Sequence, residues 1–175
     1  MHILETIGLS RIYSTGQTTQ QHALKDVHLQ IHQGEFIAVM GPSGSGKSTL
    51  LYSISGMDRM TTGSVLFNGK EINNLSENEL SNLRLNNMGF VYQQMHLLKN
   101  LNIRDNIILS AYRAKKGSRR LINNRATELM KRTGIAELAD RDITQVSGGQ
   151  LQRVPFVGHL LISPRFSLVT SQQAR

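Results

Sequence analysis

The stretch that decides the fold is Gly41-Pro42-Ser43-Gly44-Ser45-Gly46-Lys47-Ser48-Thr49. It matches the pattern G-x-x-x-x-G-K-[ST], which predicts a phosphate-binding loop where a strand precedes it and a helix follows it. The apolar run Phe36–Met40 is the expected buried strand, and Leu50–Ile54 continues the chain without a helix breaker. The sequence around the loop therefore favours a nucleoside triphosphate site over a plain glycine-rich turn.

The residue types in this loop suit the binding of phosphate. Gly44 and Gly46 let the backbone curl so that several N–H groups point at one anion, and the N-terminus of the following helix adds partial positive charge. Lys47 has the length to reach the terminal phosphates, and the hydroxyl of Ser48 is a suitable ligand for Mg²⁺. We therefore expect a nucleoside triphosphate and Mg²⁺ to bind here together.

The composition indicates one folded domain without disulfides. The chain has 175 residues and no cysteine, which excludes a disulfide framework and a thiolate metal site. Its first residues carry neither a basic leader nor a long apolar segment, and the apolar run Val154–Ile162 is shorter than the ~20 residues of a membrane-spanning helix. We expect a cytosolic protein, either free or peripheral to a membrane.

The net charge is +8, and basic side chains gather between Arg113 and Arg141. Nucleic acid and anionic lipid are partners that use such clusters. Apolar residues recur among these charges and aromatic residues are few, which is typical of amphipathic helices with a solvated face. We therefore expect no nucleic-acid partner.

The rest of the chain predicts short strands and helices. Strands are expected at Ile3–Ile7, Ala23–Ile31, Ser64–Phe67 and Met88–Tyr92. Helices are expected from Ser76, where Glu79 completes a capping box, to about Leu85, then from Ile103 to about Asp140 with breaks at Gly117 and Gly134, and after Ser147–Gly149. This order predicts one α/β domain with a helical insertion between two core strands.

A second glycine motif is Gln145-Val146-Ser147-Gly148-Gly149-Gln150-Leu151-Gln152-Arg153. Together with the phosphate loop it resembles the signature of ABC-type ATPases, the nucleotide-binding subunits of ATP-driven transporters. Between the two motifs, Phe90-Val91-Tyr92-Gln93 resembles the Q-loop of that family, and Tyr13 resembles its adenine-stacking aromatic residue. The resemblance extends from about Ser10 to Val154.

The stretches His22–Val27 and Gln93–Leu98 resemble the subfamily that serves lipoprotein release, macrolide export and antimicrobial-peptide resistance. This resemblance implies an α/β fold: a P-loop NTPase core of the ABC type, with an N-terminal antiparallel β subdomain and a helical subdomain at about residues 94–154. It implies that residues 1–154 form a partial ATP-binding domain, which lacks the C-terminal strands and helices of the family.

The resemblance also implies roles and partners. The segment Ser147–Gln150 would form an anion nest facing the γ-phosphate of an ATP molecule held by a second ATP-binding subunit, in a head-to-tail dimer. Gln93 would lie beside Mg²⁺ and the attacking water, at the edge that touches an integral membrane permease. Tyr13 would stack on adenine. The chain would then be the ATP-binding subunit of an exporter, peripheral on the cytoplasmic face of the cell membrane.

The chain departs from the family after Val154. Hydrolysis in the family also needs a Walker B carboxylate, an adjacent glutamate and a later histidine, yet no Asp or Glu follows Asp142. Pro155 falls within the expected signature helix, where an interior proline costs about 3 kcal/mol. We therefore expect a chain that binds nucleotide weakly and hydrolyses no ATP.

A change of reading frame explains this departure. If one nucleotide is lost just after the codon of Val154, codons for Val169–Arg175 permit Asp-Glu-Pro-Thr-Gly-Ala in the original frame, which is the missing family motif. Residues 155–175 are then an out-of-frame tail in which Phe166–Val169 substitutes for the central strand, and the incomplete sheet favours aggregation. Coding DNA in which no one-base insertion near codon 154 restores the motif contradicts this hypothesis.

Two other functions stay open. One is a non-transport ABC ATPase of the DNA-repair or translation type, although such proteins usually carry coiled-coil insertions or tandem cassettes for which this chain has no room. The other is a regulator that holds ATP without turnover. Measured nucleotide affinity and steady-state ATPase activity separate a regulator of this kind from a defective exporter subunit.

Overall fold

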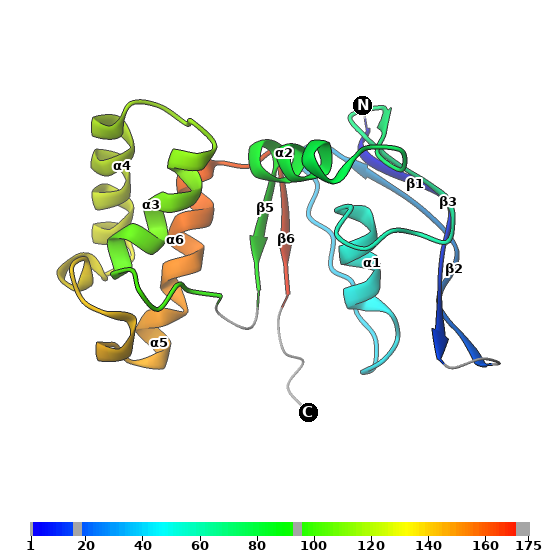
Figure 1. Cartoon of the computed structure of the whole chain (residues 1–175), viewed down its shortest axis with the longest axis horizontal. Coiled ribbons are helices and arrows are strands. Elements are labelled where there is room, and N and C mark those ends of the chain that lie inside the picture. The colour runs from blue at the N-terminus through cyan, green and yellow to red at the C-terminus, as the bar shows by residue number, and fades with distance from the viewer. Residues whose placement is uncertain (1, 16–18, 93–95, 171–175) are drawn as a thin grey trace. The chain divides into compact units, whose positions relative to one another are not determined.

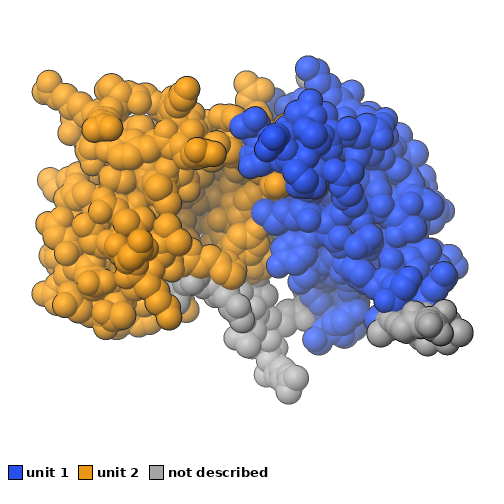
Figure 2. All heavy atoms as spheres, viewed as in Figure 1, with its two compact units in different colours: residues 1–82 blue, residues 83–175 orange. Residues whose placement is uncertain are grey.

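The computed structural model describes residues 2–15, 19–92 and 96–170. The chain forms two compact units, Met1–Asn82 and Leu83–Arg175, which Figure 2 colours separately. The first unit contains an antiparallel sheet and the second contains a helical core with a pair of parallel strands (Figure 1). These layers are those of the α/β fold expected from the sequence.

A four-stranded antiparallel sheet organises the first unit. Its strand order is β2-β1-β3-β4, with β1 (His2–Thr15), β2 (Thr19–His32), β3 (Thr62–Phe67) and β4 (Lys70–Glu71). The strands predicted for this part of the sheet are confirmed, and β1 and β2 extend beyond the predicted ranges because they pair with each other as a long hairpin. Apolar side chains of β1 and β3 fill the core, among them Leu4, Leu9, Val65 and Phe67.

The hairpin contains a bulge at Ala23. Arg11 lies opposite Leu24 and Ile12 lies opposite His22, so Ala23 is an extra residue on β2. A bulge takes its residue out of the regular ladder and turns the backbone locally. The Ala23 carbonyl can therefore face a neighbouring segment instead of the partner strand.

Two helices follow in this part of the chain, α1 (Lys47–Ile54) and α2 (Glu77–Asn87). The predicted capping box of α2 is confirmed, because Ser76 N–H donates to Glu79 Oε2 at 2.8 Å and Glu79 N–H donates to Ser76 Oγ at 3.4 Å. Leu80 is only 2% exposed and packs at Gly56, where an added Cβ would lie 2.8 Å from Leu80 Cδ2. A glycine after α1 thus makes room for a side chain of α2.

The predicted core strand Phe36–Met40 is wrong. These residues form neither helix nor strand, and Phe36 and Met40 are 94% and 80% exposed. An apolar run becomes a strand only when a neighbouring strand takes up its backbone N–H and C=O groups. No sheet in the described residues includes this segment. The apolar composition of this segment predicted a buried strand, but a strand forms only where the backbone pairs with a neighbouring strand.

The second unit combines two parallel strands with helices. Strands β5 (Met88–Val91) and β6 (Phe166–Val169) pair with Met88 opposite Phe166. The helices are α3 (Ile103–Arg113), α4 (Arg119–Arg132), α5 (Gly148–Leu151) and α6 (Arg153–Ile162), with short 3₁₀ turns at Ala136–Leu138 and Ile143–Gln145. The predicted strand at Met88 and the predicted helix breaks at Gly117 and Gly134 are confirmed. No helix in the described part of the chain has the length and apolar character that crossing a membrane requires.

The segment after Val154 contributes to the interior of this unit. Val157 and Leu161 of α6 are 0% and 2% exposed and belong to the core cluster of α3 and α4. Leu168 of β6 is also buried. The predicted substitute strand Phe166–Val169 is confirmed as β6.

Pro155 lies near the start of a helix instead of inside one. The helix that begins at Gly148 ends at Leu151, and α6 begins at Arg153 after a turn at Gln152. Pro155 is therefore in the first turn of α6, where backbone N–H groups have no partner within the helix. The cost expected for an interior proline does not apply, because the interruption at Gln152 moves the helix start next to the proline.

Candidate functional site

Left-handed glycines shape the phosphate loop. Gly44 and Gly46 have φ angles of 81° and 88°, and Gly46 is the N-cap of α1. A Cβ on Gly46 would lie 2.4 Å from the carbonyl oxygen of Ala23, so the loop is in close contact with the bulge of β2. A Cβ on Gly41 would lie 2.8 Å from Ser45 Oγ. The loop is thus compact, and contact with the hairpin fixes where α1 begins.

The ammonium group of Lys47 lies inside the loop. Its Nζ donates to the carbonyl oxygens of Gly41 and Pro42 at 2.8 and 2.6 Å and to Ser45 Oγ at 3.3 Å. An ammonium group has three donors, so the loop alone satisfies all of them. This geometry places a positive charge within the curled backbone, at the position where phosphate oxygens would replace the carbonyl oxygens as acceptors.

The hydroxyl groups after Lys47 suit a cation that is also held by phosphates. Ser48 is exposed in the first turn of α1, and Thr49 follows it. Mg²⁺ keeps several waters and usually binds through one or two protein groups and the phosphates of its substrate. Among the described residues no group of three or more His, Cys, Asp or Glu side chains could hold a metal by itself. The exposed hydroxyl of Ser48 could serve as one protein ligand to a nucleotide-bound Mg²⁺.

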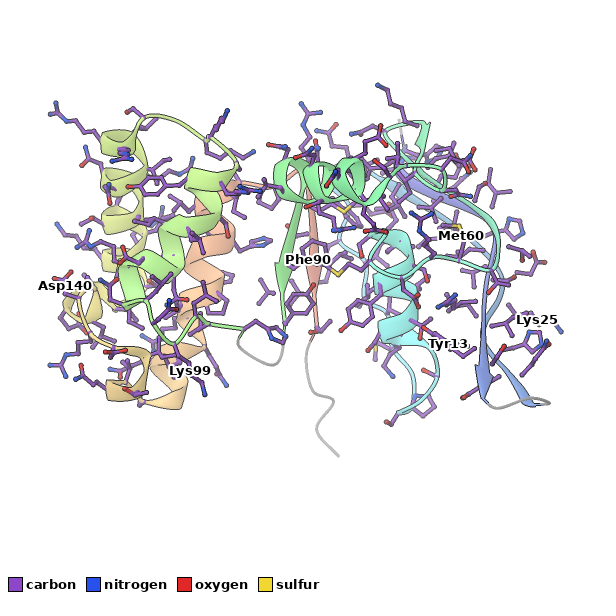
Figure 3. The ribbon with its side chains drawn as sticks, viewed as in Figure 1. Tyr13, Lys25, Met60, Phe90, Lys99 and Asp140 are labelled. Carbon is purple, nitrogen blue, oxygen red and sulfur yellow. The ribbon has the colours of Figure 1, made fainter. Side chains whose placement is uncertain are left out.

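Tyr13 is held by two side chains that the sequence did not single out. Its hydroxyl donates to Asp58 Oδ2 at 2.5 Å, and the Arg11 guanidinium carbon lies 4.5 Å from its ring centroid. Arg11 also pairs with Asp58 through contacts of 2.7 and 3.0 Å. Figure 3 labels Tyr13 among the side chains of the first unit. Arg11 and Tyr13 are two apart on a strand and so share a face, which would have signalled Arg11; no sequence signal points to Asp58.

The pKa of the Arg11 guanidinium reflects these neighbours. Burial alone lowers this pKa, but hydrogen bonding to Tyr13 and the charge of Asp58 outweigh burial and raise it above its ordinary value. The side chains of Arg11 and Asp58 are 23% and 24% exposed. The three groups therefore form a charged and partly shielded cluster on the first unit.

The second glycine motif forms an open helix start in the second unit. Ser147 caps α5 with a capping box, in which Ser147 N–H donates to Gln150 Oε1 at 3.1 Å and Gln150 N–H donates to Ser147 Oγ at 3.4 Å. Gly148 and Gly149 are exposed, and nothing lies within 4 Å of a Cβ added to either. The backbone at these glycines is therefore open to a partner that approaches closely.

The remaining predicted site residue, Gln93, lies outside the described residues. The structure brings Tyr13 and the phosphate loop into one unit, where Tyr13 lies on β1 of the hairpin and Gly46 of the loop contacts Ala23 on β2. Ser147 belongs to the other unit. Arg11 and Asp58, which hold Tyr13, and Ala23, which meets Gly46, were not predicted from the sequence.

Comparison with known proteins finds relatives in the family that the two glycine motifs indicate. The profile of the ABC transporter family matches residues 24–169. The chain is 42% identical over 161 residues to the macrolide export ATP-binding/permease protein MacB of Hahella chejuensis, which covers 91% of this chain and 24% of that protein. It is 35% identical over 162 residues to the lipoprotein-releasing system ATP-binding protein LolD 1 of Rhodopseudomonas palustris, covering 93% of this chain and 72% of that protein. The chain thus spans about a quarter of the length of the macrolide export relative.

Solved structures of ABC transporter cassettes are also similar to this chain. The dimeric structure of the bacterial ABC transporter cassette MJ0796 superposes with a TM-score of 0.87 and 35% identity, covering 95% of this chain and 72% of that one. The same cassette in a post-hydrolysis state bound to ADP and Pi superposes with a TM-score of 0.87. The similarity extends over both motifs, since the matched residues run from within β2 to the end of β6. The chain belongs to the ABC transporter family, as an ATP-binding domain of the type found in MacB and LolD.

Proposed function

We propose that this chain binds ATP with Mg²⁺ in the phosphate loop and serves as the ATP-binding component of an exporter. The observation that carries this proposal is the position of the Lys47 ammonium inside the glycine loop, 2.8 Å from the Gly41 carbonyl oxygen and 2.6 Å from that of Pro42. A fixed cation within a curled backbone is complementary to a terminal phosphate. The macrolide export and lipoprotein release relatives support the class of transport.

Different residues of the first unit bind different parts of the nucleotide. The loop backbone and Lys47 hold the phosphates, Ser48 contributes a hydroxyl to Mg²⁺, and Tyr13 stacks on the base. Mg²⁺ supplies charge neutralisation between the phosphate oxygens when it is bound. Before ATP arrives, Lys47 is already satisfied by the loop, so binding exchanges one set of oxygen acceptors for another and needs little rearrangement of α1.

We further propose that the chain hydrolyses ATP very slowly by itself. A water molecule that attacks a phosphate is activated by a general base, which contributes about 10²–10⁴ in rate. No Asp or Glu follows Asp142, and residues 155–175 do not supply the family's Walker B carboxylate or its glutamate. The same segment packs into the second unit, so a reading frame changed after Val154 is compatible with a folded chain that binds nucleotide without turnover.

The second glycine motif and Gln93 provide the proposed contacts with partners. The open backbone at Gly148 and Gly149 suits the γ-phosphate of an ATP bound to a second subunit, so ATP would close a head-to-tail dimer. The segment around Gln93 would meet an integral permease at the cytoplasmic face of the cell membrane. Two dimeric structures of the relative MJ0796 support the first of these contacts.

Calorimetric titration of the full chain with ATP and Mg²⁺ tests the proposal. Lys47→Ala removes charge-assisted hydrogen bonds to phosphate and is expected to weaken ATP binding about 10- to 100-fold. Lys70→Ala is the matched control, because Lys70 is an exposed lysine on β4. Equal affinities of the two variants would refute phosphate binding by the loop. A steady-state ATPase assay in the same samples is expected to show no more than background turnover.

A further inference from the structure

The strongest feature outside the phosphate loop is the cluster of Arg11, Tyr13 and Asp58. Arg11 Nη2 lies 2.7 Å from Asp58 Oδ1, and Arg11 Nε donates to Asp58 Oδ2 at 3.0 Å. The Tyr13 hydroxyl donates to the same Oδ2 atom at 2.5 Å. One carboxylate thus holds both side chains, and a paired, two-point contact of this kind fixes orientation as well as distance.

The cluster fixes the orientation of the Tyr13 ring. The Arg11 guanidinium lies over one face of the ring, 4.5 Å from its centroid. The phenol oxygen is anchored at the other end of the side chain by Asp58. With one face covered and the hydroxyl anchored, a planar ligand can stack only on the opposite face.

Tyr13 lies on the same hairpin that contacts the phosphate loop. Tyr13 lies opposite Gln21 on β2, and Ala23, two residues further along, is the point where β2 meets Gly46. A short stretch of one strand therefore connects the ring to the loop. A nucleotide whose phosphates lie in the loop would therefore be bound next to the hairpin that carries this aromatic ring.

We propose that Arg11 and Asp58 are positioning residues for nucleotide binding, which hold Tyr13 in the orientation that accepts the base. This inference rests on the proposed function, because it needs ATP in the phosphate loop. In this arrangement the side chains of Arg11 and Asp58 contact each other and Tyr13. They act through Tyr13, and their effect is therefore limited to ligands that carry a base.

The test compares ATP with inorganic tripolyphosphate, both with Mg²⁺, in calorimetric titrations of the full chain. Arg11→Gln and Asp58→Asn are expected to weaken ATP binding about fivefold, a part of the stacking contribution, and to leave tripolyphosphate binding unchanged. Arg59→Gln is the control, since Arg59 is the next residue after Asp58 but pairs with Glu77. It should leave both affinities unchanged.

A second variant distinguishes positioning from a general loss of structure. In a Tyr13→Ala background, Arg11→Gln should weaken ATP binding no further, because the ring that it positions is gone. A further loss in that background, or an equal loss of ATP and tripolyphosphate binding, overturns the inference. If Lys47→Ala weakens ATP binding but Arg11→Gln does not, the inference alone fails. If Lys47→Ala weakens neither ligand, the proposed function fails and the inference fails with it.

Discussion

Gly46 is the residue at which the phosphate loop meets the rest of its unit. Its φ of 88° disfavours any side chain, and an added Cβ would lie 2.4 Å from the Ala23 carbonyl oxygen. The left-handed conformation costs a non-glycine residue about 1–2 kcal/mol, and a contact with backbone adds to this cost. We therefore expect Gly46→Ala to lower the free energy of unfolding by more than about 2 kcal/mol.

Gly44→Ala is the matched control for this prediction. Gly44 has a similar φ of 81°, but nothing lies within 4 Å of a Cβ added there. Urea unfolding followed by circular dichroism should show that Gly44→Ala loses about 1–2 kcal/mol, from backbone conformation alone. If the free energy of unfolding falls by the same amount in both variants, the contact between residue 46 and Ala23 does not affect stability.

At the scale of one helix, the break before α6 determines how Pro155 affects the stability of the chain. Because Pro155 lies in the first turn of α6, replacing it should change little. We expect Pro155→Ala to shift the free energy of unfolding by less than about 1 kcal/mol, whereas Gly158→Pro, in the middle of α6, should cost about 3 kcal/mol or more. Urea unfolding measures both variants. A gain of about 3 kcal/mol in Pro155→Ala would show that the proline acts as an interior helix breaker.

His159 links α6 to the strands and is expected to make the stability of the second unit depend on pH. Its Nε2 lies 3.0 Å from Ser167 Oγ, while its Nδ1 is buried without a hydrogen-bond partner among the described residues. Burial lowers the pKa of His159 from its ordinary value of 6.5. The unfolded chain therefore takes up this proton at a higher pH than the folded chain.

The sign of the pH effect follows from this lowered pKa. The stability that the neutral imidazole contributes is present above pH 6.5 and is lost as the pH falls through the lower pKa of the folded state. We expect the free energy of unfolding to decrease as the pH falls below 6.5, and His159→Gln to flatten this decrease. Urea unfolding at a series of pH values measures the slope, and equal slopes in both proteins would contradict the assignment.

At the scale of the whole molecule, each of the two units contains buried apolar side chains of its own. Ile107 is 1% exposed in the second unit and Leu4 is 1% exposed in the first. Ile107→Ala or Leu4→Ala should each cost about 2–5 kcal/mol in the unit that contains it. Hydrogen exchange followed by mass spectrometry should show faster exchange mainly in the unit that carries the substitution. Equal acceleration in both units would indicate a single cooperative core.

Much of the local structure was predictable from the sequence. The capping box at Ser76, the breaks at Gly117 and Gly134 and the strand at Met88 depend on hydrogen bonds and periodicity within a few residues. The strand predicted at Phe36–Met40 was wrong, because an apolar run specifies burial but cannot specify its pairing partner. The ligand contacts of the phosphate loop, Tyr13 and Ser147 stay predictions.

The sequence by itself determined the two glycine motifs, the chemistry of Lys47 and the family. These features lie in short contiguous stretches whose residue types and spacing carry the information. Only the tertiary structure decided that Ala23 bulges toward Gly46 and that Asp58 holds Arg11 and Tyr13. Asp58 is 47 residues from Arg11, and the register of the hairpin sets where Ala23 lies. Contacts of this kind depend on how strands pair and pack, so no local pattern encodes them.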